Sequence, residues 1–173
     1  MIIQFINFLK NDLSLFIKNS RGKDDDLVIF ANLNAVIESG ADTNKLVISI
    51  VNIEEDRILK NAEPFAKNRT ETHYKSPDVS INLTCLFTYY NKNDSSYEGI
   101  ELLENVIQYF QSNPTLNIST ASDIEDSSDK FQRIHAELQS LDFEQTNQLW
   151  NLFGGIYYPS VVYKFRGIKI TNE

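Results

Sequence analysis

The alternation in residues 78–90, DVSINLTCLFTYY, constrains the fold more than any other feature of the sequence. Its odd-numbered residues are all apolar, and serine, asparagine or threonine occupies most of the positions between them. Successive side chains of a β-strand point to opposite faces, so this pattern predicts a strand with one face in the core and the other less buried. The chain is therefore expected to contain a sheet that is covered on at least one face.

Three further segments predict strands. Residues 27–31 (LVIFA) and 45–53 (KLVISIVNI) are nearly continuous in apolar, often β-branched character, which suits strands that are covered on both faces or buried centrally. The turn-rich residues 39–44 lie in the connection between them. Residues 131–138 (FQRIHAEL) alternate apolar and polar side chains from Ile134 onward, which predicts another strand.

A last strand is expected at residues 160–170, close to the end of the sequence. Val161, Tyr163 and Phe165 are odd-numbered and share one face of a regular strand, but Ile168 and Ile170 are even-numbered. A β-bulge places one extra residue in a strand and so exchanges the two faces. We therefore predict a bulge near Gly167.

The first helix is predicted at residues 2–19, where apolar residues recur with the helical spacing of three and four. Lys10 and Asp12 interrupt the apolar run, and no basic segment precedes it, so it does not resemble a signal peptide. An Arg-Gly pair at positions 21 and 22 is expected to end this helix.

Two more helices are predicted from their N-terminal caps. Ser95 and Glu98 have the spacing of a capping box, and apolar residues at helical spacing follow until an Asn-Pro pair. Asp142 and Gln145 have the same spacing and are expected to cap a third helix. Gly154 then supplies the left-handed residue that commonly ends a helix.

These elements predict an α+β fold. The expected order is helix, two strands, long loop, strand, helix, strand, helix, strand, which suggests a mixed, mainly antiparallel sheet with about three helices on one face. A chain of 173 residues is long enough for one domain with a real core and short for two, so residues 1–173 are read as a single domain with a long loop at about 55–77.

Composition narrows the classes of function. The net charge of −8 argues against general nucleic-acid binding, and no apolar run is long enough for membrane insertion. The single cysteine, Cys85, cannot form an internal disulfide. These features are typical of a soluble protein that is made inside the cell.

Candidate catalytic and metal-binding residues are few. His73 is expected in a loop and His135 on the outward face of a strand, and neither has a partner at ligand spacing. Cys85 lies on the apolar side of its strand, and Gly154-Gly155 follows a helix instead of preceding one, unlike a phosphate-binding loop. Residues 54–56 (EED) are either a solvated strand end or, less expected, a cation site. We therefore expect no catalytic residue, cofactor or metal.

The placement of basic residues is more informative. Residues 57–77 contain five basic and two acidic side chains, a local charge of +3, and Lys164, Arg166 and Lys169 make the last strand basic. This distribution is either an ordinary mixed surface or a set of patches that meet opposite charge on other subunits. A connection of this length is also usually functional or disordered.

Several segments resemble one known family. They are VNIEED at 51–56 with ILKN at 58–61, INLTCLF at 81–87, YFQSNP at 109–114, and LWNLFGGIYYPSVVYKFR at 149–166. The sequence resembles the tail-terminator or cap family of contractile injection systems, which are phage-tail-like particles, and in particular the N-terminal domain of longer cap proteins.

The resemblance implies a tail-terminator-like fold that forms a six-membered ring on the distal end of the inner tube. It implies partners of three kinds, which are further copies of the chain, the inner tube protein and the sheath protein, and it implies no catalysis. Assembly would take place in the bacterial cytoplasm, and the finished particle can act outside the cell. The alternatives are a baseplate or neck adaptor of the same kind of particle, or a small enzyme with residues 57–77 as a lid.

The expected partner-binding residues come from the basic patches and from the aromatic segment near the end of the chain. Lys164 and Arg166 are expected to point outward toward a partner, and Tyr157 and Tyr158 either anchor an interface or cover the edge of the core. The complete expected set is Arg57, Lys60, Lys67, Arg69, Tyr157, Tyr158, Lys164 and Arg166.

Overall fold

The computed structural model describes residues 1–40, 44–56, 65–67, 72–74, 78–91, 96–119 and 131–170. Its elements, in chain order, are α1 (Ile2–Arg21), β1 (Val28–Phe30), α2 (Leu33–Ser39), β2 (Lys45–Glu55), β3 (Phe65–Lys67), β4 (Thr72–Tyr74), β5 (Val79–Tyr90), α3 (Ser96–Ser112), β6 (Thr115–Ser119), β7 (Phe131–Gln139), α4 (Phe143–Leu152) and β8 (Ser160–Ile170).

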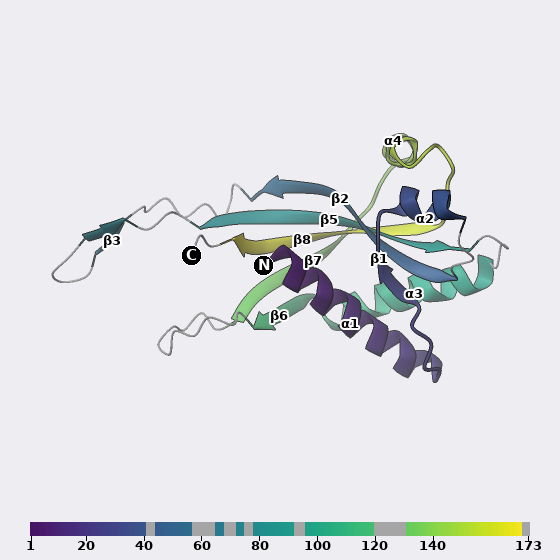
Figure 1. The fold of residues 1–173 in the computed structure, drawn as a ribbon, viewed down its shortest axis with the longest axis horizontal. Coiled ribbons are helices and arrows are strands. Elements are labelled where there is room, and N and C mark those ends of the chain that lie inside the picture. Colours follow the sequence, from purple (N-terminus) through teal and green to yellow (C-terminus); the bar gives the residue numbers. More distant parts are fainter. Residues whose placement is uncertain are drawn as a thin grey trace.

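Six strands form the main sheet in the order β1-β2-β5-β8-β7-β6 (Figure 1). The β1–β2 pair is parallel, and the other four pairs are antiparallel. The predicted α+β class and the mainly antiparallel sheet are therefore confirmed. No helix in the described part of the chain is long and apolar enough to cross a membrane.

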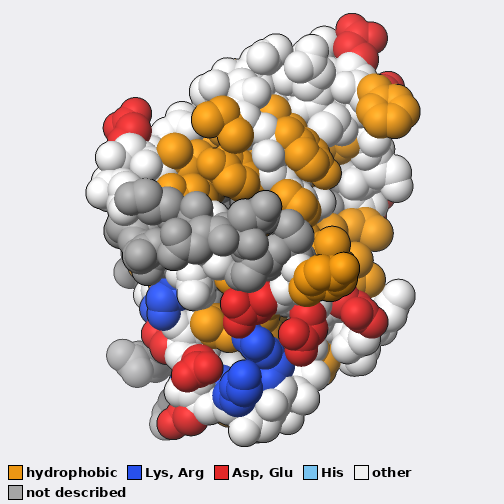
Figure 2. All heavy atoms as spheres, turned by 90° about the vertical axis from the view of Figure 1, so that its right-hand side faces the viewer, with side chains coloured by type: hydrophobic (Ala, Val, Ile, Leu, Met, Phe, Trp, Pro, Cys, Tyr) orange, Lys and Arg blue, Asp and Glu red, His pale blue; other side chains and the backbone are white. Residues whose placement is uncertain are grey.

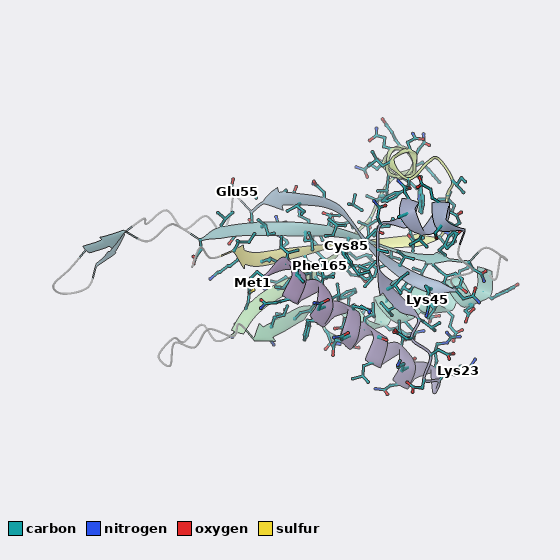
Figure 3. All side chains as sticks on the ribbon, viewed as in Figure 1. Met1, Lys23, Lys45, Glu55, Cys85 and Phe165 are labelled. Atoms are coloured by element: carbon teal, nitrogen blue, oxygen red, sulfur yellow. The ribbon has the colours of Figure 1, made fainter. Side chains whose placement is uncertain are left out.

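The larger core lies between one face of the sheet and the helices α1 and α3. Aromatic rings fill it, with Phe5 of α1 against Phe165 at 5.0 Å and Phe110 of α3 against Phe87 at 5.7 Å, each edge to face. Such pairs add to the stabilisation from burial alone. Figure 3 shows Cys85 and Phe165 in the middle of the sheet, where α1 crosses it.

A smaller core lies on the opposite face, where α2 and α4 cover one end of the sheet (Figure 1). The prediction that all helices cover one face is therefore wrong. The even-numbered Leu86 and Tyr90 of β5 are buried in this second core, so the second face of β5 is more buried than its alternation suggested. On the first face the odd-numbered residues from Ile81 to Tyr89 are buried as predicted, whereas Val79, at the start of the strand, is exposed.

The predicted bulge in the last strand is confirmed. The pairing of β5 with β8 shifts between Ile81, which faces Ile168, and Leu83, which faces Phe165. Gly167 lies within this step with φ of 90°, a left-handed conformation that glycine adopts without strain. The bulge returns Ile168 to the face that carries Phe165, so both are fully buried in the larger core.

The remaining elements differ from the expected order in three places. Helix α2 adds a fourth helix in the connection before β2, and β6 adds a strand directly after α3. Within the expected long loop, β3 and β4 pair as a second antiparallel sheet, which Figure 1 shows beyond the ends of β2 and β5. His73, expected in a loop, therefore lies in strand β4.

Candidate partner-binding surfaces

Lys164 and Arg166 lie on the same face of the sheet as α2 and α4, beyond the end of the smaller core. In β8 they share the orientation of the buried Val162, because alternate residues of a strand point to one side. Thr84 of the neighbouring strand β5 faces Lys164, and Glu137 of β7 faces it from the other side. The two basic side chains therefore lie on a polar region of sheet.

Both basic side chains form ion pairs within the chain. Lys164 contacts the carboxylate of Glu54 across strand β5, and Arg166 lies 3.9 Å from Asp56 and 3.7 Å from Glu137. We call this region, made by Glu54, Asp56, Glu137, Lys164 and Arg166, the ion-pair face. The hydrogen bond from Lys164 holds the pKa of the Glu54 carboxyl below its usual range. The basic strand is thus neutralised by carboxylates of the same chain.

This arrangement changes the interpretation of two predicted site residues. Lys164 and Arg166 were expected to point toward a partner, but their side chains are only 26% and 36% exposed. Sequence reasoning missed Glu54, Asp56 and Glu137 as their partners, because only the strand register brings these segments together. Any partner of the ion-pair face therefore meets a nearly balanced surface.

The two tyrosines after α4 lie in different environments. Tyr158 is half-buried, with its ring 5.7 Å from Tyr90 and 5.8 Å from Trp150, and burial raises the pKa of its hydroxyl. Tyr157 lies 5.6 Å from Trp150 but remains 64% exposed. Tyr158 thus covers the core edge, whereas Tyr157 has most of its ring surface available to a partner.

The predicted basic residues of the 57–77 segment are mostly outside the described part of the chain. Arg57, Lys60 and Arg69 fall there, and Lys67 ends strand β3. Their role in binding a partner stays a prediction.

Helix α4 is positioned by local features that the sequence predicted. The carboxylate of Asp142 accepts from the backbone N–H of Gln145 at 2.8 Å, and the Gln145 side chain accepts from the backbone N–H of Asp142 at 3.1 Å. After the helix, Gly154 and Gly155 have φ of 86° and 79°, which turns the chain back toward β8. The backbone N–H of Gly155 donates to the carbonyl of Trp150 at 2.8 Å.

This helix and the segments that flank it carry an unusual number of exposed apolar side chains. We call this region the α4 surface, which consists of Leu138, Leu141, Phe143, Leu152, Ile156 and Tyr157. Phe143 is 97% exposed, and a hollow of about 200 Å³ lies between the end of β7, α4 and the start of β8. Figure 2 views the molecule from the right-hand side of Figure 1. Hydrophobic side chains gather in its upper half, the side of α2 and α4, whereas most charged side chains lie in its lower half.

Two residues considered for catalysis, Cys85 and His135, are engaged in packing and in a local hydrogen bond, respectively. Burial raises the pKa of the Cys85 thiol to about 12, so little thiolate forms at neutral pH. His135 is exposed on β7 and its Nδ1 lies 3.0 Å from the Thr115 hydroxyl. Among the described residues, no three acidic, histidine or cysteine side chains are grouped in a way that could hold a metal ion.

Comparison with solved structures shows the same fold in two caps of injection particles. The chain superimposes on the tube-terminating cap of the anti-feeding prophage with a TM-score of 0.62 and 16% identity, covering 97% of this chain and 55% of that one. For the sheath/tube terminator of the extracellular contractile injection system PVC, in its extended state, the TM-score is 0.65 and the identity 15%, with coverage of 100% and 57%. The chain thus spans a little over half the length of either structure.

A search of curated proteins finds no match. A family model, by contrast, matches residues 6–173, which is nearly the whole chain, and it describes the N-terminal domain of Pvc16. The chain therefore belongs to the Pvc16 N-terminal domain family.

Proposed function

We propose that this chain is a structural cap, or tail terminator, of a contractile injection system. The observation that carries the proposal is the family match over residues 6–173. It is supported by the shared fold with two structures that are described as a tube-terminating cap and a sheath/tube terminator. In this role the chain binds the distal end of the inner tube, contacts the last sheath ring and stops further polymerisation.

The proposed action is preferential binding. A cap stabilises the extended particle only if it binds the completed tube end and the extended sheath more tightly than other states, because a ligand shifts an equilibrium through its unequal affinities. A ring of six copies requires an interface in which one side of a subunit fits a different side of the next. With a net charge of −8 on each copy, such contacts need to be apolar or locally opposite in sign.

The proposal assigns no reaction to the chain. The two structures with the same fold are described as caps or terminators, which supports a structural role, and the buried Cys85 thiol, with its pKa of about 12, is a poor nucleophile. The partners are further copies, the inner tube protein and the sheath protein. Assembly takes place in the bacterial cytoplasm, and the cap then stays with the extracellular particle.

The test is electron microscopy of particles made with and without the full-length protein that carries this chain. A cap predicts tubes of irregular, excessive length, or particles that contract early, and restoring the wild-type protein should restore normal length. Absence of tails would instead indicate a baseplate or neck adaptor that starts assembly. Tails of normal length and stability would overturn both structural roles and would redirect the search toward an enzymatic activity.

A further inference from the structure

The outer side of α1 carries no charged residue. Every residue of this helix that is exposed is uncharged, although 23% of the whole chain is charged. We call the central line of this side, spaced four residues apart, the α1 stripe, which consists of Ile3, Asn7, Asn11, Leu15 and Asn19. Ile3 is 73% exposed and Leu15 is 57% exposed. Depletion of charge is a mark of the centre of protein interfaces.

The charged residues of α1 lie beside the stripe, and most of them are used within the chain. Asp12 accepts a hydrogen bond from Tyr109, Lys18 pairs with Asp24, and Arg21 pairs with Glu98. The stripe therefore runs for sixteen helical positions, roughly 24 Å, without a charge of its own. A row that combines exposed Ile3 and Leu15 with uncharged polar residues has the composition of an interface centre.

The α4 surface has the complementary properties. It contains large exposed apolar side chains, and from residue 138 to residue 163 the sequence has no basic residue and only two acidic ones, Asp142 and Glu144. Lys10, a half-buried cation beside the α1 stripe, has no ion-pair partner among the described residues. Both surfaces are poor in charge, and Lys10, beside the N-terminal half of the α1 stripe, is opposite in sign to Asp142 and Glu144.

The two surfaces lie on opposite sides of the subunit. Helix α1 belongs to the larger core under one face of the sheet, and α4 belongs to the smaller core on the other face (Figure 1). Two different surfaces on opposite sides are what a head-to-tail contact between copies requires, because each copy then uses both surfaces and covers those of its neighbours.

We propose that the α4 surface of one copy binds the α1 stripe of the next copy. This inference rests on the proposed function, because it supplies the contact that closes the cap ring. It assigns Phe143 and its apolar neighbours to one side of that contact, and Ile3, Leu15 and Lys10 to the other. The occupant of the α4 surface is thus a second copy of the same chain.

Cross-linking between single-cysteine variants tests the contact. The L15C and F143C variants each gain one exposed thiol, while Cys85 is buried and stays unreactive. A flexible bis-maleimide should join L15C to F143C when the two are mixed, but should join neither variant to itself. The mixed dimer should form roughly tenfold more than collision alone allows, since contact raises the effective concentration of the second thiol. The I3C variant mixed with F143C provides a second position on the stripe.

The matched control pairs L15C with N117C, because Asn117 is exposed on β6, away from the α4 surface. A double variant with L15C and F143C should give a ladder of products that ends at the ring size. Mixed dimers no more abundant than those of the control pair, at both stripe positions, would overturn the contact. The length of particles made without the protein separates the two proposals. If cross-linking fails and these particles have overlong tubes, this interface alone is rejected. If cross-linking succeeds and their tubes have normal length, the cap role is rejected.

Discussion

Arg21 at the end of α1 donates a hydrogen bond to Glu98 in the first turn of α3 at 3.0 Å, although the two residues are 77 positions apart. The Arg21 side chain is only 9% exposed, and the hydroxyl of Tyr89 donates to the other oxygen of Glu98 at 2.8 Å. The two helices that cover the larger core are thus joined at one end by a partly buried ion pair.

Replacing Arg21 with methionine should lower the free energy of unfolding by about 2 kcal/mol, because it removes a charged hydrogen bond and leaves Glu98 with one donor fewer. Urea unfolding followed by circular dichroism measures the change. The control is Lys18→Met, since Lys18 pairs with the exposed Asp24 at the protein surface and should have little effect. Equal effects of the two substitutions would contradict the role assigned to Arg21.

The same carboxylate should make stability depend on pH. The hydrogen bond from Tyr89, and then that from Arg21, lower the pKa of Glu98 below 4.5. Its contribution is therefore present above the unfolded pKa and is lost as the pH falls through the folded value. Glu98→Gln should destabilise the protein at pH 7, and the difference from wild type should shrink at acidic pH. The control is Glu104→Gln, on the exposed side of α3, whose stability difference from wild type should not change with pH in this way. If both variants show the same pH dependence, it does not come from the Glu98 carboxylate.

Gly99 in α3 is required by close packing. A Cβ atom at this position would lie 2.6 Å from Cδ1 of Tyr89, well inside contact distance. Gly99→Ala should therefore destabilise the fold by about 1–3 kcal/mol, despite the better helix propensity of alanine. Combining it with Tyr89→Leu should cost less than the sum of the two single changes, because the smaller side chain gives way. Strict additivity in urea unfolding would show that the clash is relieved elsewhere.

Features with a local physical cause could be predicted from the sequence. The alternation of β5, the bulge at Gly167 and the capping box of Asp142 and Gln145 all follow from residues that are neighbours in the chain. Helix α2 could not be predicted in this way. Only two of its residues, Leu33 and Val36, are buried, and two positions are too few to show a helical period. The Asn32 side chain that caps this helix at 3.0 Å was the available signal.

The partner-binding surfaces were harder to predict than the fold. Charge counted along the sequence makes residues 164–169 basic, but the sheet register places Glu54 beside Lys164 across an intervening strand. Segments that meet in this way are separated by more than one hundred residues, so no local pattern reports the pairing. The α4 surface was hard to predict for a different reason. Its exposed Phe143 and Leu152 are apolar, so in the sequence they look like core residues.

Cys85 should be inert in the folded protein. Burial raises its pKa to about 12, so very little of the thiol is ionised at pH 8, and the side chain is fully buried in the larger core. A chromogenic disulfide reagent should therefore react only after denaturant unfolds the chain, at a rate that follows the unfolded fraction. Rapid reaction of the native protein would mean that the centre of the sheet opens. The same measurement validates the background of the cross-linking experiment.

Arg166 should act mainly within the subunit. Its guanidinium faces Asp56, whose side chain is 2% exposed, and Glu137. Arg166→Met should lower the free energy of unfolding by about 1–2 kcal/mol, less than for a fully buried pair because Arg166 is partly solvated. Lys169→Met removes the same charge from an exposed position of β8 and should change stability by less than about 0.5 kcal/mol. If both variants unfold at the same urea concentration, the guanidinium contributes nothing to the fold, and a partner outside the chain becomes the better explanation for its position.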